Sequence, residues 1–262
     1  MAKIFIVSNT KGGTGKTTTA LHILPTIAYL EGYKNINYYQ LDDNNKVNIS
    51  SKAINVKNYT INNTSDVMDK VELDIALDNE TVNIIDIGGG NDTKSVLNYL
   101  KTKSEIKKED ITFFIPITTN LSQQQNLQDT IELIKNSHSN PKIILILNEV
   151  IDLENYKDEF INIFGNEVYE IAPITDLIEQ SCEKVIKIEK DNLYQVMEYK
   201  KKILLDGYIN ALEIDKNREK LKQQYVMDYK EDEDLEAYYK KKRNLRFIQQ
   251  IIDTVERFPK IA

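Results

Sequence analysis

The chain has 262 residues, a formal net charge of -7 and a single cysteine. This length suffices for one α/β domain with an appendage. One cysteine excludes a disulfide framework and favours a reducing compartment, so we expect a cytoplasmic protein. The sequence has no run of about 18 apolar residues, so we expect no transmembrane helix. The first strand-like residues follow the start of the chain so closely that we also expect no signal peptide. The acidic charge excludes a protein that is cationic throughout, so any DNA binding must be local.

A glycine-rich segment separates the first predicted strand from the first predicted helix. Residues 4–7 are β-branched or aromatic and predict a buried strand, and residues 17–29 repeat apolar side chains at helical spacing. Between them, Gly12, Gly13 and Gly15 allow backbone angles that side chains disfavour. Such a loop can point its N–H groups inward beside the helix N-terminus, which makes a phosphate-sized anion site.

Two lysines stand at the ends of this loop. Lys16 offers a charge for the β- and γ-phosphates, and the Thr17 hydroxyl is a suitable ligand for Mg²⁺. Thr10 occupies the first glycine position of the common P-loop pattern, so the segment reads "KGGTGKT" with Lys11 added. A glycine-rich turn without a ligand is the alternative. The order of strand, glycines, Lys-Thr and helix favours the nucleotide.

This variant resembles the deviant Walker A motif of the ParA/MinD family of dimeric ATPases. The resemblance implies ATP and Mg²⁺ as ligands and a homodimer, in which Lys11 reaches the partner's nucleotide while Lys16 serves its own. It also implies that the whole loop and the helix start hold the nucleotide: Lys11, Gly12, Gly13, Thr14, Gly15, Lys16, Thr17 and Thr18.

Strand-like and helical segments alternate along the first 190 residues. This alternation predicts a P-loop NTPase fold of the α/β class, with a mostly parallel sheet flanked by helices. Ligands of such sheets bind beyond the carboxyl ends of the strands. The further predicted strands are 36–41, 82–87, 111–115, 143–147 and 168–171, and the further predicted helices are 95–100, 127–134 and 155–163.

Asp42 follows the second predicted strand, in "QLDDNNKV". The family has an Asp-x-Asp pair here, and this chain keeps the second aspartate but has Gln40 at the first position. The resemblance implies that Asp42 is catalytic and orients or activates the attacking water. A solvated turn is the alternative, because Asp and Asn favour turns.

Asp86 lies at the end of the third predicted strand, in "NIIDIGGGND". The segment is similar to a Walker B motif, which implies that Asp86 holds Mg²⁺ directly or through a water. Gly88, Gly89 and Gly90 stand where the family often has a Pro-Pro pair. Their N–H groups could approach a γ-phosphate and act as a switch loop. A purely structural glycine loop is the alternative.

Two later strand ends complete the predicted nucleotide site. In the family an asparagine at the end of the fifth strand reads the adenine edge, which implies this role for Asn148, since an amide both donates and accepts. The resemblance also implies that Pro173 and Ile174, after the sixth predicted strand, pack on the purine.

Arginine is absent from residues 1–194. Phosphoryl transfer commonly recruits an arginine to neutralise transition-state charge. Either Lys11 does this work or hydrolysis is slow, and both favour a switch ATPase over a metabolic kinase.

The composition changes near residue 191, so we predict an ATPase domain at 1–190 and a helical C-terminal extension at 191–262. An acidic block at 230–236 precedes a basic block. Four interpretations of the basic block remain open: a solvated helical face, a DNA-backbone patch, a membrane-surface helix or a docking site for a protein. Its cations are Lys240, Lys241, Lys242, Arg243 and Arg246.

The resemblance, taken with these features, implies a plasmid-partition ATPase that dimerises with ATP, binds DNA without sequence preference and is stimulated by a centromere-binding or relaxosome protein. Association with the nucleoid would follow from DNA binding. The alternatives are a conjugation or mobilisation accessory ATPase of the same family, or a MinD-like membrane-positioning ATPase, the membrane being the less expected partner.

Overall fold

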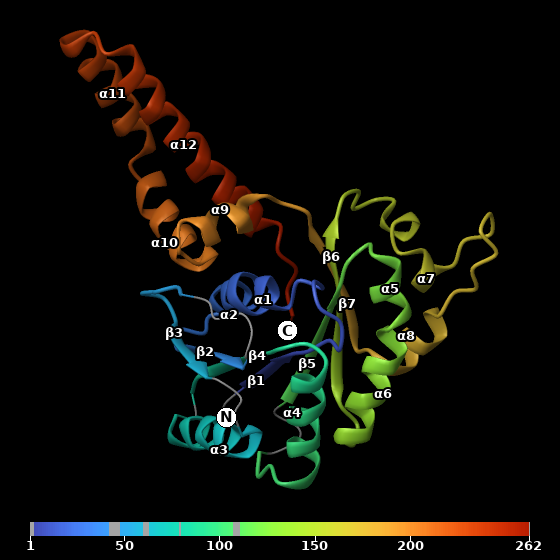
Figure 1. Cartoon of the computed structure of the whole chain (residues 1–262). Helices are drawn as coiled ribbons and strands as arrows, with labels where there is room; N and C mark the ends of the chain where they lie inside the picture. Colours follow the sequence, from blue (N-terminus) through green and yellow to red (C-terminus); the bar gives the residue numbers. More distant parts are fainter. Residues whose placement is uncertain (1–2, 42–47, 60–62, 79, 107–110, 262) are drawn as a thin grey trace.

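The computed structural model describes residues 3–41, 48–59, 63–78, 80–106 and 111–261. Within these ranges the chain forms a seven-stranded sheet in the order β3-β2-β4-β1-β5-β6-β7, and each neighbouring pair is parallel (Figure 1). The predicted α/β fold is therefore confirmed. The strands are Lys3–Val7 (β1), Ile36–Leu41 (β2), Asn55–Tyr59 (β3), Val82–Ile87 (β4), Ile111–Ile117 (β5), Lys142–Val150 (β6) and Lys184–Glu189 (β7).

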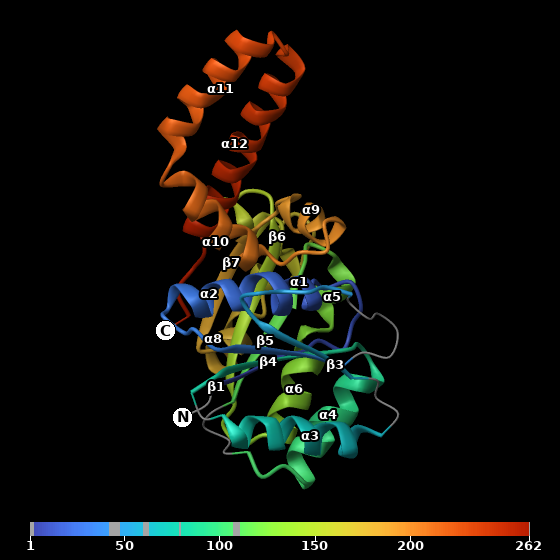
Figure 2. The same ribbon diagram turned by 90° about the vertical axis from the view of Figure 1, so that its left-hand side faces the viewer.

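Helices cover both faces of the sheet (Figures 1 and 2). One face packs against α1, the π-helical segment after it, α2, α9, α10 and α12, and the other against α3, α4, α6, α7 and α8. The helices are Lys16–Thr18 (α1), Thr19–Ile23 (π-helical), Leu24–Leu30 (α2), Thr64–Leu77 (α3), Asn91–Thr102 (α4), Leu121–Gln125 (α5), Leu127–Ser137 (α6), Tyr156–Asp158 (3₁₀), Ile161–Phe164 (α7), Thr175–Ser181 (α8), Leu193–Tyr199 (α9), Leu204–Asp215 (α10), Arg218–Asp232 (α11) and Leu235–Glu256 (α12).

The central strands end together at one edge of the sheet. Strands β1, β4 and β5 are buried along almost their whole length, as near-continuous apolar runs in parallel sheets should be. Val7, the last residue of β1, is in register with Asp86 of β4 on one side and with Phe114 of β5 on the other. The loops that follow these strands therefore leave the sheet side by side, where ligands of α/β folds bind.

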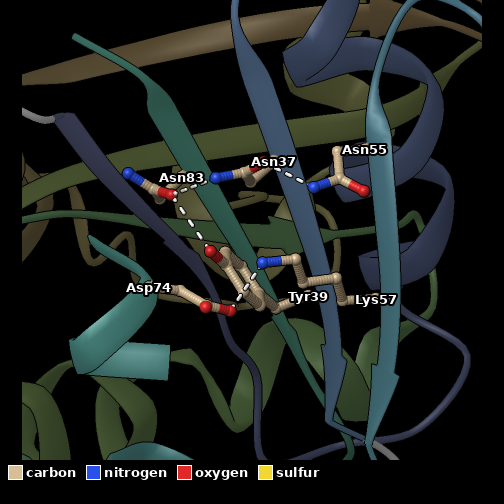
Figure 3. A network of polar contacts seen from close by, with 6 residues as sticks. All are labelled: Asn37, Tyr39, Asn55, Lys57, Asp74 and Asn83. Atoms are coloured by element: carbon tan, nitrogen blue, oxygen red, sulfur yellow. Dashed lines mark hydrogen bonds and ion pairs between the residues drawn. The ribbon is translucent and has the colours of Figure 1, made fainter. Parts of the chain in front are cut away.

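A polar network joins the outer strands on the face toward α3 (Figure 3). The Oδ1 of buried Asn83 accepts hydrogen bonds from Asn37 Nδ2 at 3.0 Å and from the Tyr39 hydroxyl at 3.3 Å. Lys57 donates to Asp74 of α3 at 2.6 Å, with its ammonium 5.4 Å from the centroid of the Tyr39 ring. Burial raises the pKa of the Tyr39 phenol, which keeps this group a neutral donor. The network satisfies buried polar groups of the sheet and serves its stability.

The C-terminal extension divides into a packed part and a projecting part. Helices α9, α10 and the second half of α12 belong to the same apolar core as the P-loop helix. The Nδ1 of buried His22, in the π-helical segment, accepts a hydrogen bond from the Leu204 N–H at 3.1 Å and so joins that segment to α10. Helix α11 and the first half of α12 form a hairpin that extends away from the sheet (Figure 2). The boundary at residue 190 stays a prediction.

Two predicted elements are wrong. Residues 168–171 lie in a turn closed by an isolated antiparallel bridge between Asn166 and Ile171, and the last strand is β7. The predicted helix at 155–163 consists of a 3₁₀ turn and the four-residue α7. Strand β3 and helices α3 and α8 were not predicted. The helix predicted at 17–29 exists, but its middle part is π-helical.

Candidate functional site

The glycine-rich loop is anchored to the end of β5. The Ser8 N–H donates to the Phe114 carbonyl at 3.1 Å and continues the pairing of β1 with β5. The side chain of buried Asn9 donates to the Pro116 carbonyl at 2.9 Å, and its Oδ1 accepts the Lys11 N–H at 2.9 Å. Asn9 thereby fixes the point at which the loop turns away from the sheet.

Two glycines of the loop are required by its geometry. Gly13 and Gly15 have φ of 70° and 85°, in the left-handed region that favours glycine. A β-carbon at Gly15 would also collide with the amide nitrogen of Asn148 and would lie 3.2 Å from its Cγ. Helix α1 begins directly after Gly15, whose carbonyl accepts the Thr19 N–H at 2.8 Å. The loop therefore bends sharply into a helix N-terminus, the arrangement that binds anions.

Lys16 lies between the two glycine-rich loops. Its side chain is mostly buried, and its Nζ donates to the Lys11 carbonyl at 2.9 Å. A β-carbon at Gly89 would lie 3.6 Å from the same Nζ, so the segment after β4 passes directly beside the Lys16 ammonium. The Gly90 N–H donates to the Thr10 carbonyl at 3.0 Å and fastens this segment to the P-loop. The lysine predicted to bind phosphate thus occupies the centre of the loop cluster.

Asp86 lies on the same side of the sheet as the P-loop helix. Its carboxylate is 2% exposed and accepts a hydrogen bond from the Tyr38 hydroxyl at 3.0 Å. The strand register places Asp86 between Val7 of β1 and Gln40 of β2. Gln40, which replaces the family's first aspartate, is therefore the neighbour of the predicted metal ligand, and it adds no second negative charge there.

The segment after β4 is held by a hydroxyl group. The Thr93 Oγ1, in the first turn of α4, donates to the Gly88 carbonyl at 2.8 Å. A β-carbon at Gly88 would collide with the Asp92 carboxylate. Close packing therefore favours glycine at position 88, and the φ of 60° favours it at position 90. These two requirements account for part of the triplet without a switch role. The switch role stays a prediction.

The donor set of the site fits Mg²⁺. The ion prefers oxygen ligands and takes most of them from water and phosphate, so a protein supplies only one or two. Thr17 lies in the first turn of the P-loop helix, which packs against β4, and Asp86 offers a buried carboxylate from that strand. Among the described residues, no cluster of three or more His, Cys, Asp or Glu side chains forms a metal site of its own. Thr17 and Asp86 are thus suited to a metal that arrives with a nucleotide.

The remaining predicted nucleotide ligands have mixed outcomes. Asp42 lies outside the described residues, and its role stays a prediction. Asn148 is 3% exposed and packs on the P-loop at Gly15, a position it reaches from the end of β6. Pro173 does not follow a strand, because the segment predicted as a strand before it, residues 168–171, lies in a turn. It packs near Gly165, where a β-carbon would lie 3.0 Å from the Pro173 ring. The adenine and purine roles are untested.

The cations in the basic block of α12 have different surroundings. Lys241 donates to Asp228 of α11 at 2.6 Å, and this hydrogen bond lowers the pKa of Asp228. Lys242 lies 6.0 Å from the centroid of the Tyr238 ring and lines a groove between α11 and α12 with Arg246. Lys240 and Arg243 are exposed.

Several residues of the site carry no motif and were not predicted. Asn9 and Tyr38 each make a hydrogen bond that positions a predicted ligand. Gln123, of α5, donates to the Gly12 carbonyl at 3.3 Å, while its Oε1 accepts the Thr118 hydroxyl at 2.6 Å. A polar residue directly after a buried strand, as at Asn9, is a usable signal. Tyr38 and Gln123 contact the site only through the tertiary fold.

Comparisons with known proteins show a likeness of fold. No protein-family model matches the chain, and neither does any curated protein. Apo McdA from Cyanthece is 15% identical, with a TM-score of 0.50 over 78% of this chain and 92% of that one. The septum site-determining protein MinD from Pyrococcus horikoshii OT3, complexed with Mg-ADP, is 14% identical, with a TM-score of 0.47 over 77% of this chain and 87% of that one. A TM-score of 0.47 is too low for the MinD likeness to support a conclusion about this chain. The McdA likeness shows the shared fold.

Proposed function

We propose that this chain is an ATP-dependent switch ATPase of the ParA/MinD type, which dimerises with ATP, hydrolyses it to ADP and phosphate, and serves plasmid DNA partition. One observation carries the ATPase part: the buried Lys16 ammonium lies between the P-loop and Gly89. A lysine held at a helix N-terminus beside two glycine-rich loops is suited to the β- and γ-phosphates of a nucleotide.

The residues of the site divide the work of phosphoryl transfer. The N–H groups of the loop cradle the phosphates, and Lys16 exchanges its bond to the Lys11 carbonyl for one to a phosphate oxygen. Thr17 and Asp86 would hold Mg²⁺, which would neutralise phosphate charge when bound. The Tyr38 hydroxyl keeps the Asp86 carboxylate in place. Asp42 orients the attacking water. Catalysis of this type depends on positioning and electrostatics.

Lys11 serves the second subunit in this proposal. Its backbone is fixed by Asn9, but its side chain is exposed at the tip of the loop. An exposed cation at this point can reach a neighbouring molecule. Arginines 218, 243 and 246 lie on the projecting hairpin, and Arg257 binds Glu189 at 3.0 Å. Lys11 is therefore better placed than any of the four arginines to neutralise transition-state charge in the partner's site.

The decisive experiment is calorimetry of ATP binding, followed by turnover assays. Lys16→Ala should weaken ATP binding by at least about tenfold, because a charge-assisted contact to phosphate is lost. Lys11→Ala should bind ATP with nearly unchanged affinity, but should neither hydrolyse it nor form the ATP dimer. Lys94→Ala, a cation of α4 outside the loops, is the matched control. Unchanged ATP affinity in Lys16→Ala would refute the site, and normal turnover in Lys11→Ala would refute its role across the dimer.

The DNA contact is assigned to the exposed cations of α12. A triple variant, Lys240→Ala, Lys242→Ala and Arg243→Ala, leaves the bond between Lys241 and Asp228 intact, so the hairpin should stay folded. For the ATP-bound variant, the slope of log DNA affinity against log salt concentration should then become shallower. The change should be about 0.9 for each phosphate contact removed. An unchanged salt slope would place DNA binding elsewhere.

One observation bears on the MinD-like alternative. The apolar residues that make α12 amphipathic, among them Ile248, Ile252 and Val255, are buried in the core of the chain. That face is occupied by packing and is not available to a bilayer surface. Among the described residues, no helix combines the length and apolarity needed to cross a membrane. A mobilisation or conjugation ATPase with a relaxosome partner fits the same site and remains the second candidate.

A further inference from the structure

The projecting hairpin has opposite charges at its two ends. Residues 228–236, around the turn between α11 and α12, contain six carboxylates and one lysine. Residues 237–252 of α12 contain five cations and no carboxylate. Of these cations, Lys241 is neutralised inside the hairpin by Asp228. The others lie toward the base of the hairpin on exposed positions, so the charge separation persists at the surface.

A groove of about 440 Å³ opens between α11 and α12 in the basic part. Its lining combines an apolar floor with a cationic rim and includes no carboxylate among the described residues. A second hollow of about 490 Å³ adjoins it through Arg246 and is lined by Leu235, Glu236, Tyr239 and Arg243. The floor of the groove is formed by Tyr225, Val226, Tyr238 and Leu245, and the rim by Arg218, Lys222, Lys242 and Arg246.

The hairpin also leaves apolar side chains exposed. Val226, Leu235 and Tyr239 are 43%, 48% and 50% exposed. Helix α11 has no fully buried residue along its length. Apolar groups gathered beside a charged rim are typical of an interaction surface.

We propose that this groove receives the acidic turn of a second copy of the same chain, so that two hairpins pack antiparallel about a two-fold axis without nucleotide. A two-fold interface must be self-complementary, since each contact occurs twice. The hairpin meets this condition, because its acidic turn and its basic groove lie on one rigid pair of helices.

The register follows from the helix repeat. If the two-fold axis crosses α12 at the level of Lys240, Leu235 of one copy lies level with Leu245 of the other. Asp234 then lies level with Arg246. Leu235 and Leu245 are about 15 Å apart along one helix, at a rise of 1.5 Å per residue. One register therefore brings an exposed apolar residue to the groove floor and a carboxylate to the groove rim.

Duplex DNA is the less suitable occupant. Phosphates would meet the cationic rim, but they supply nothing for the four apolar residues of the floor. The acidic turn supplies both parts, because Leu235 stands among the carboxylates. The hairpin extends away from the P-loop edge of the sheet (Figure 2), so this interface is distinct from one formed through Lys11.

The test is charge reversal followed by mixing. Asp232→Lys with Glu236→Lys reverses the turn, and Lys222→Glu with Arg246→Glu reverses the groove rim; all four side chains are exposed. In sedimentation equilibrium without nucleotide, the unmodified chain should dimerise. Each double variant should associate about tenfold or more weakly, because like charges then meet at both of the symmetric contacts between a turn and a groove. An equimolar mixture of the two variants should recover the association. Circular dichroism checks that each variant is folded.

The control is Lys216→Glu with Lys220→Glu, which changes the charge equally at exposed positions that do not line the groove. It should associate like the unmodified chain. A monomeric unmodified chain, or a mixture that fails to recover association, would overturn the proposal. A groove-reversed variant that still dimerises but loses duplex DNA would assign the groove to nucleic acid. Because nucleotide is omitted, the outcome is independent of the proposed ATPase activity.

Discussion

The close packing of Asn148 on the P-loop predicts a strong difference between two glycine-to-alanine substitutions. At Gly15, φ is 85° and a β-carbon would collide with the Asn148 amide. At Gly12, no atom of the described residues lies within 4 Å of a β-carbon. Gly15→Ala should therefore disturb the loop, and Gly12→Ala is its matched control three residues earlier.

The magnitude follows from two terms. Holding a non-glycine residue in the left-handed region costs about 1–2 kcal/mol, and forcing extra volume into a packed site costs about 1–3 kcal/mol. Gly15→Ala should thus lower the free energy of unfolding by about 2–5 kcal/mol, which corresponds to a fall in Tm of roughly 4–20 °C for a chain of this size. ATP affinity should fall as well, since the loop N–H groups are displaced.

Urea unfolding and ATP calorimetry measure both effects. A double-mutant cycle with Asn148→Ala separates the terms, because removal of the amide relieves the collision but not the backbone strain. We expect a coupling free energy of about 1–3 kcal/mol. If Gly15→Ala unfolds within about 0.5 kcal/mol of Gly12→Ala, the geometry of the loop has been misjudged.

Three further outcomes are expected. Tyr38→Phe leaves the buried Asp86 carboxylate without its 3.0 Å donor and should cost about 1–3 kcal/mol in urea unfolding; Tyr39→Phe loses only a longer bond between neutral groups, so an equal cost would contradict the assigned role. Asp42→Ala should bind ATP and retain, in chromatography, the association that ATP adds to the nucleotide-free state, whereas turnover at the native rate would make Asp42 a turn residue. Burial raises the pKa of Cys182 from 9.0 to about 12. The folded state therefore keeps a proton that the unfolded state releases, and stability should fall as pH rises above about 9. Rapid iodoacetamide labelling of the native thiol near neutral pH, as fast as in urea, would count against this burial.

The site could be predicted where the chemistry follows directly from a strand end. In a parallel sheet, residues after neighbouring strands meet at one edge, so the sequence alone could place Lys16 and Asp86 at the same edge of the sheet. The strands themselves were recognisable because β1, β4 and β5 are buried on both faces and form apolar runs.

The last strand was misplaced because two short segments have similar β-branched content. Residues 168–171 and β7 both satisfy a local β pattern. Strand β7 is a half-exposed edge strand, with Ile186 and Ile188 buried between exposed neighbours. Its period-2 alternation of charged and apolar residues was the available signal. Pairing with β6, which decides between the two segments, is a tertiary contact.

The basic block shows that consecutive charged residues in a helix need not lie on the same face of it. Consecutive helical residues are rotated by about 100°, so neighbours in the sequence face different directions. Lys241 turns toward α11 and is paired with Asp228, while Lys242 and Arg246, four residues apart, share the groove. Arg243 lines the adjoining hollow. The sequence predicts one cationic patch, but the helix divides it into a structural ion pair, a groove rim and an exposed remainder. A variant that removes the whole block therefore tests several roles together, whereas the groove and the DNA contact each need substitutions that leave Lys241 in place.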